Sequence, residues 1–225
     1  MRVRVPFKNL AGPVPQRPLS ERRAALLLVD CHRYTLSPRD GYARIARERG
    51  ILRELAEYYQ QLKQVVPNLE RLVRACRDRG VPIVFTRLAG DGADPRSIAA
   101  QARATGLWAG ADSIEAQFMP GLEPRSDDPV LDKTTAAAFA GTALGAVLRA
   151  RQVRHVIIAG VLANEAVMRT AHSASDLGYD VVVVSDACAA ETWTLHALSM
   201  TLLVGGLIRL RTVSGVLEML DGRRT

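Results

Sequence analysis

Four short apolar runs alternate with longer segments of helical spacing, and this alternation is the feature that most limits the possible folds. The runs cover residues 24–30 (AALLLVD), 81–86 (VPIVFT), 155–159 (HVIIA) and 180–185 (DVVVVS). Their apolar residues are continuous rather than alternating, which is typical of strands buried on both faces of a parallel sheet. Weaker runs at 129–131 and 207–210 bring the expected total to about six strands.

The segments between these runs have the spacing of amphipathic helices. Apolar side chains between Leu62 and Cys76 form one stripe, and Gly80 is expected to end that helix. Residues 140–150, 166–177, 193–204 and 213–220 predict further helices. Strands that alternate with helices of this length form right-handed crossovers. We therefore predict an α/β fold: a doubly wound, mainly parallel sheet of about six strands with helices on both faces, in three layers.

The chain of 225 residues is long enough for one sizeable domain. Its first 23 residues are basic and proline-rich, and we interpret residues 1–23 as an N-terminal extension of a single domain at 24–225. The longest irregular stretch is 89–123. A loop of that length in a compact domain is usually functional, so we predict a lid or an interface arm there.

The formal net charge of +7 raises the question of a nucleic-acid partner. The arginines are spread along the chain and alternate with acids, as in residues 44–49 (RIARER). A solvated basic surface, or attraction of anionic substrates, explains the charge equally well. We expect a small-molecule substrate, and neither nucleic acid nor membrane as a partner.

Three cysteines, at 31, 76 and 188, have the spacing of neither a disulfide framework nor a metal site. The first twenty residues lack the apolar stretch of a secretory signal, and no apolar run approaches the ~18 residues of a membrane span. These features predict a cytoplasmic protein.

Candidate site residues follow the strands. Ligands of open parallel sheets bind beyond the carboxyl ends of the strands. Asp30, Arg87, Lys133 and the 160–166 turn should therefore share one mouth, where a carboxylate, a lysine and a helix N-terminus can support acid–base chemistry and stabilise an oxyanion. Each has an alternative: Asp30 can be a turn cap, and Lys133 a solvated loop residue.

Several motifs together resemble the isochorismatase-like hydrolases. These are LLLVD at 26–30, PIVFTR at 82–87, VLDK at 130–133, AFAGT at 138–142 and VIIAGVLANEAVMRTAHSASDLGYDVVVVSDACA at 156–189. The resemblance runs over roughly residues 24–220. Segments 106–108 (GLW) and 113–117 (SIEAQ) further resemble the branch of the N-carbamoylsarcosine amidases.

The resemblance implies a specific catalytic arrangement without a cofactor. An aspartate at the position of Asp30 takes a thiol proton, and a lysine at the position of Lys133 supports the pair. The nucleophilic cysteine would stand at residue 166. Backbone N–H groups around Leu162, Ala163 and Ala166 would form the oxyanion hole, with a cis peptide expected at 162–163.

This chain departs from the family pattern because residue 166 is alanine. Two explanations remain open. Ala166 replaces a cysteine by design, and the native enzyme is an amidohydrolase that cleaves a C–N bond of an amide or carbamoyl (ureido) compound. Alternatively the alanine is natural, and Asp30 acts as a general acid on a vinyl ether, as in isochorismatases. A third hypothesis is a catalytically inactive binding or scaffold homologue.

Five residues are candidates for substrate contact, and the resemblance further implies a homodimer or homotetramer. His32 stands where relatives commonly have glutamine, and Arg87 suits a carboxylate, or alternatively pairs with Asp30 or Glu115. Tyr34, Trp108 and Phe118 can form an apolar wall, or else belong to an interface or the core. We expect no metal, because the histidines share no ligand spacing with His32. The sequence does not identify the substrate.

Overall fold

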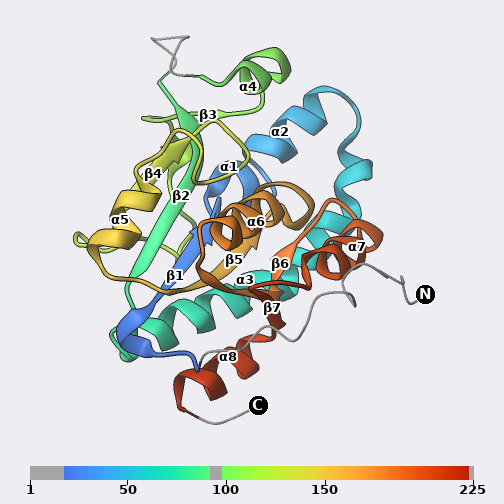
Figure 1. Ribbon diagram of the computed structural model, residues 1–225. Helices are drawn as coiled ribbons and strands as arrows, with labels where there is room; N and C mark the ends of the chain where they lie inside the picture. Colours follow the sequence, from blue (N-terminus) through green and yellow to red (C-terminus); the bar gives the residue numbers. More distant parts are fainter. Residues whose placement is uncertain (1–17, 92–97, 223–225) are drawn as a thin grey trace.

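The computed structural model describes residues 18–91 and 98–222, and these build around one seven-stranded sheet (Figure 1). The strand order is β3-β2-β1-β5-β6-β7, with β4 paired to β2. Every strand pair is parallel. The strands are β1 (Ala24–Val29), β2 (Ile83–Gly90), β3 (Ala109–Gly110), β4 (Val130–Lys133), β5 (His155–Val161), β6 (Asp180–Ala189) and β7 (Ile208–Arg211).

The six strands expected from the sequence are all present, and a seventh, β3, escaped prediction because it has only two residues. Two strands, β2 and β6, end four residues later than expected. β2 continues past Thr86 to Gly90, because β4 and β3 pair with its second half, and β6 continues to Ala189 beside the end of β5.

The helices alternate with the strands along the chain. They are α1 (Arg33–Leu36), α2 (Gly41–Glu48), α3 (Ala56–Asp78), α4 (Ala100–Thr105), α5 (Leu144–Ala150), α6 (Met168–Asp176), α7 (Trp193–Leu203) and α8 (Val213–Leu220). The helix expected at 140–150 begins only at Leu144, after Gly141 at a φ of 74°. The helix expected at 166–177 is divided: a π-helical turn, η6 (Ala163–Val167), precedes α6.

Helices cover both faces of the sheet, which confirms the three-layer architecture. On one face, apolar side chains of α3 and α8 pack against alternate strand residues such as Leu26 and Leu28. On the other face, α5, α6 and α7 pack against their neighbours Ala25 and Leu27. β1 is buried along its whole length, as the continuous apolar run predicts.

The parallel strands bring their carboxyl ends to one edge of the sheet, and a glycine permits their close approach there. Gly160 in β5 pairs with Val29 in β1 and has a φ of 129°. A Cβ at this position would lie 2.1 Å from the Val29 carbonyl oxygen. Any side chain would therefore push the two strands apart directly beside Asp30.

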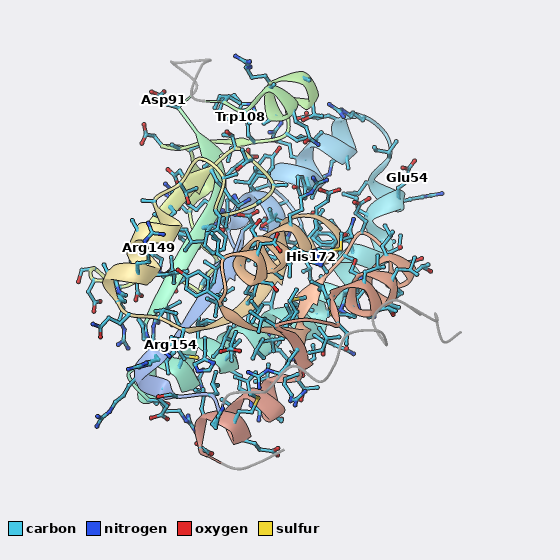
Figure 2. The ribbon with its side chains drawn as sticks, in the orientation of Figure 1. Glu54, Asp91, Trp108, Arg149, Arg154 and His172 are labelled. Carbon is cyan, nitrogen blue, oxygen red and sulfur yellow. The ribbon has the colours of Figure 1, made fainter. Side chains whose placement is uncertain are left out.

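The segment 89–123, expected to be irregular, contains α4, β3 and a short 3-10 turn, η5 (Ile114–Ala116). Residues 92–97 and most of the expected extension at 1–23, namely 1–17, lie outside the described residues. Figure 2 labels Trp108 near α4 and Arg154 just before β5, so these two residues mark opposite ends of the sheet.

Candidate active site

An ion pair joins the ends of β1 and β4. The Lys133 ammonium Nζ lies 2.7 Å from Asp30 Oδ2, and both residues are about 3% exposed. Lys133 Nζ also donates to the Thr135 carbonyl oxygen at 3.1 Å. The two side chains come from opposite flanks of β2, which lies between β1 and β4. The structure therefore brings Asp30 and Lys133 together at one edge of the sheet.

Asp30 is held by backbone geometry and by two threonines. Its φ of 55° lies in the left-handed region, where a non-glycine residue is uncommon and often marks a functional site. Thr86 Oγ1 donates to Asp30 Oδ1 at 3.0 Å, and the Asp30 N–H is directed at the Thr86 carbonyl oxygen at 3.1 Å. Thr35 Oγ1 donates to the Asp30 carbonyl oxygen. This turn presents the carboxylate at the mouth of the sheet.

A cavity of about 220 Å³ opens beside this ion pair. Ala166 lies in its wall together with Asp30 and Lys133, so the three proposed catalytic positions share one space. The volume is below the ~300–1,000 Å³ of drug-sized ligand sites, which favours a compact ligand. The remaining wall residues are Thr35, Tyr42, Leu88, Gln101, Ala102, Thr105, Leu107, Thr134, Ala136, Val161, Leu162, Glu165 and Glu191.

The turn between β5 and α6 forms the floor of the cavity. The cis peptide bond lies at Val161–Leu162, one residue earlier than the expected 162–163. The Leu162 carbonyl oxygen accepts from the N–H groups of Glu165 and Val167, both at 3.1 Å, which closes the π-helical turn. Leu162 and Ala166 line the cavity, whereas Ala163 is fully buried and is not part of its wall.

None of the three cysteines lines this cavity. Cys31 and Cys188 are buried in the clusters on opposite faces of the sheet, and Cys76 is buried on α3. Burial raises the pKa of the Cys31 thiol and, to about 12, the pKa values of Cys76 and Cys188. Such thiols are not poised as nucleophiles, so the cavity has no substitute for the sulfur absent from residue 166.

The structure does not place Arg87 in the cavity wall, contrary to its expected role as a carboxylate ligand. Its guanidinium forms a bidentate pair with Asp132, at 2.6 Å for Nε to Oδ1 and 2.8 Å for Nη2 to Oδ2. Its Nη1 donates to the Ala116 carbonyl oxygen at 3.1 Å. Successive residues of a strand point to opposite faces, so Arg87 turns away from the side on which Thr86 meets Asp30.

The other four expected substrate contacts also lie outside the cavity wall. His32 is fully buried, and Phe118 packs edge-on against Phe85 with ring centroids 5.2 Å apart. Tyr34 is buried behind Tyr42, whose ring centroid is 5.0 Å away. Trp108 follows the wall residue Leu107 but is not itself part of the wall. Tyr34 thus packs against a wall residue, and none of the four is itself part of the wall.

Burial lowers the pKa of His32, and the nearby Asp30 carboxylate opposes this change only in part. The backbone carbonyl groups of Asp30 and Leu88 also oppose it, but burial is the largest cause. A neutral imidazole is therefore the form that fits this position.

Sequence reasoning missed several wall residues. Glu165 lines the cavity, although the sequence analysis gave it no role in the site. Glu191 follows β6 and reaches the cavity because β6 is four residues longer than expected. Residues of α4 contribute a side of the wall that no periodicity in 89–123 indicated. Thr86 carried a usable signal: it ends the predicted run 81–86, and parallel pairing sets it opposite Val29.

Asp186, near the end of β6, has a structural role, since its Oδ1 accepts from the Val213 N–H at 2.7 Å at the start of α8. Within residues 18–91 and 98–222, no three His, Cys, Asp or Glu side chains form a group that could hold a metal ion. In the same ranges, no helix combines the length and apolar character that crossing a bilayer requires.

The profile of the isochorismatase domain matches residues 24–213. The chain belongs to the isochorismatase family. It is 30% identical over 159 residues to the uncharacterized isochorismatase family protein YwoC of Bacillus subtilis, covering 70% of this chain and 84% of that protein.

Two other relatives carry names that state an activity. Identity is 26% over 155 residues to the ureidoacrylate amidohydrolase RutB of Acinetobacter baylyi, covering 61% of this chain and 63% of that protein. It is 28% over 130 residues to the N-carbamoylsarcosine amidase of an Arthrobacter species, covering 54% and 48%. The chain thus spans about half to two thirds of these two relatives.

Solved structures of the family share the fold. A cysteine hydrolase from Pseudomonas syringae pv. phaseolicola superposes with a TM-score of 0.75 at 22% identity, covering 94% of this chain and 99% of that one. An isochorismatase family protein from Desulfovibrio vulgaris gives 0.73 at 25% identity, covering 89% and 99%. The isochorismatase-like, mainly parallel α/β fold is confirmed.

Proposed function

We propose that the cavity is the active site of a hydrolase that cleaves the C–N bond of a small amide or carbamoyl compound. The observation that carries this proposal is the buried Asp30–Lys133 pair in the same wall as residue 166. The activities named for two relatives, a ureidoacrylate amidohydrolase and an N-carbamoylsarcosine amidase, support the choice of bond.

The proposed catalytic roles follow from where residue 166, Asp30 and Lys133 lie in the cavity wall. A cysteine at residue 166 would pass its proton to Asp30 and attack the carbonyl carbon of the substrate. N–H groups of the 162–166 turn would face the developing oxyanion. The leaving nitrogen would take the proton from Asp30, and water would then hydrolyse the thioester, with Asp30 again accepting a proton. Lys133 keeps the carboxylate oriented and neutralises its charge in this buried position.

Alanine at 166 cannot form the thioester, so in this chain the site binds its substrate without the covalent step. Replacing Ala166 with cysteine tests the proposal. The Ala166→Cys protein should release ammonia from members of a panel of primary amides and ureas, and iodoacetamide should abolish that release. The unchanged protein should release none.

A second candidate function rests on the absence of a thiol from the cavity wall beside an intact Asp30. In that case Asp30 protonates a vinyl ether, and the unchanged protein cleaves isochorismate-like substrates. Asp30→Ala should then abolish the activity and Asp30→Asn nearly so. This route needs a proton on Asp30, whereas an ammonium at 2.7 Å pairs best with a carboxylate, so we place it second. A protein that shows neither activity would be a binding homologue.

We also propose that the chain forms a homodimer or homotetramer through α7. Residues 192–208 contain no Asp, Glu, Lys or Arg, and Trp193, Leu198 and Leu202 on α7 are 39–49% exposed. An uncharged apolar face is where copies of a +7 chain repel each other least. Light scattering should show a dimer or larger species, and Leu202→Glu should shift it to monomer. A monomeric unchanged protein would contradict this proposal.

A further inference from the structure

The charges in the cavity wall are the opposite of those of the whole chain. The sequence has 30 basic and 23 acidic residues, but the charged side chains of the wall are Asp30, Glu165, Glu191 and Lys133. Three acids therefore face one base. Among the described residues, no arginine lines this cavity.

Asp30 and Lys133 neutralise each other at 2.7 Å, so the remaining charge of the wall comes from the two glutamates. Glu191 accepts a hydrogen bond from the uncharged amide of Asn164 at 2.9 Å. Glu165 pairs with Arg169 at 3.0 Å, but both side chains are about half exposed, and such pairs are well screened by water. A ligand therefore meets at least one acid without a cationic partner.

Arg87, which the sequence suggested as a ligand for an anionic substrate, is already paired with other groups. All three nitrogens of the Arg87 guanidinium already donate hydrogen bonds: Nε and Nη2 to Asp132, and Nη1 to the Ala116 carbonyl oxygen. Releasing it would leave Asp132 without its partner. The other polar wall residues, such as Gln101 and Thr105 on the α4 side, carry no charge that would favour a carboxylate.

We propose that the substrate carries a cationic group, or at least no anionic group, at the end away from the scissile bond. An ammonium group would lie toward Glu191 and Glu165, and a carboxylate there would be rejected. This inference rests on the proposed C–N hydrolase function for its bond type, but the charge preference itself follows from the wall.

Three ureas of similar size test the preference: (2-aminoethyl)urea, which is cationic, propylurea, which is neutral, and 3-ureidopropionate, which is anionic. Binding to the unchanged Ala166 protein is measured by calorimetry at low salt. We expect the cation to bind best, at least about threefold more tightly than the anion, since Glu165 is partly exposed, Glu191 is exposed, and water screens part of their attraction. Added salt should reduce the ratio.

Two variants locate the effect. Glu191→Gln and the double change with Glu165→Gln should lower the affinity for (2-aminoethyl)urea much more than the affinity for propylurea. The matched control is Glu218→Gln, on the exposed face of α8, which removes one charge without touching the cavity. This control should leave the ratio of the two affinities, for (2-aminoethyl)urea and for 3-ureidopropionate, unchanged.

Equal or tighter binding of 3-ureidopropionate would overturn the inference, and so would an absence of binding by all three. The same ureas offered to Ala166→Cys separate the two proposals. Fastest turnover of 3-ureidopropionate would support the C–N hydrolase and reject the cationic substrate. Preferential binding of the cation, with no turnover of any amide or urea, would reject the hydrolase and retain the charge preference.

Discussion

Asp30 and Lys133 are 103 residues apart in the chain, yet their carboxylate and ammonium groups are 2.7 Å apart in the interior. The contact exists because β2 pairs with β1 on one side and with β4 on the other, so both residues reach the same edge of the sheet. A buried pair of this kind costs desolvation energy, and that cost is easier to explain by chemistry than by stability.

Breaking this pair from one side should destabilise the protein strongly. Asp30→Ala leaves the Lys133 ammonium buried and unpaired, so the free energy of unfolding should fall by about 3–5 kcal/mol. Lys133→Met should also destabilise, and the double variant should lose less than the sum of the two single changes. Urea unfolding measures all three. Additive losses within about 0.5 kcal/mol would show that the two groups do not interact.

Gly160 should tolerate no side chain. Gly160→Ala places a Cβ 2.1 Å from the Val29 carbonyl oxygen, and we expect a loss of about 3 kcal/mol or more. Gly178 is the matched control, because its φ of 85° is also positive but no atom lies within 4 Å of its Cβ position. Gly178→Ala should cost only the backbone strain of about 1–2 kcal/mol. Thermal or urea unfolding that showed equal losses for the two would contradict the close strand approach.

His32 should make stability depend on pH in a defined direction. Its pKa is lowered by burial, so below about pH 6.5 the unfolded chain takes up a proton that the folded chain does not. The free energy of unfolding should therefore fall as the pH drops from about 6.5, by up to about 1.4 kcal/mol per pH unit.

The control for this prediction is His32→Gln, which removes the imidazole and keeps a polar side chain. Asp30 and Lys133, the two charged groups that act on the pKa of His32, are the same in both proteins. The difference in unfolding free energy between the two should thus isolate the titration of His32. A difference that stays constant between pH 5 and pH 8 would mean that folding does not change the pKa of this imidazole.

The sequence predicted the sheet well because buried parallel strands leave a local signal. Residues 24–29 are apolar at every position, and a run of this length between turn signals favours a strand buried on both faces. The same logic placed Asp30 and Lys133 at one edge. By contrast, β3 and α4 leave almost no signal, since two-residue strands and six-residue helices depend on the tertiary contacts around them.

The side chains around the pair were harder to predict than the pair itself. Arg87 follows the right strand, but the alternation of strand side chains turns it toward Asp132. Glu191 enters the wall only because β6 is longer than its apolar core. Both outcomes depend on register and strand length, which composition and periodicity leave open.

The central claim is that Asp30, Lys133 and residue 166 form one hydrolytic site. The most direct measurement is ammonia release by the Ala166→Cys protein from primary amides and ureas, with Ala166→Cys/Asp30→Asn as its control. We predict ammonia release from at least one compound by the single variant, inhibition by iodoacetamide, and none from the double variant. A folded Ala166→Cys protein that releases no ammonia across the panel would contradict the claim.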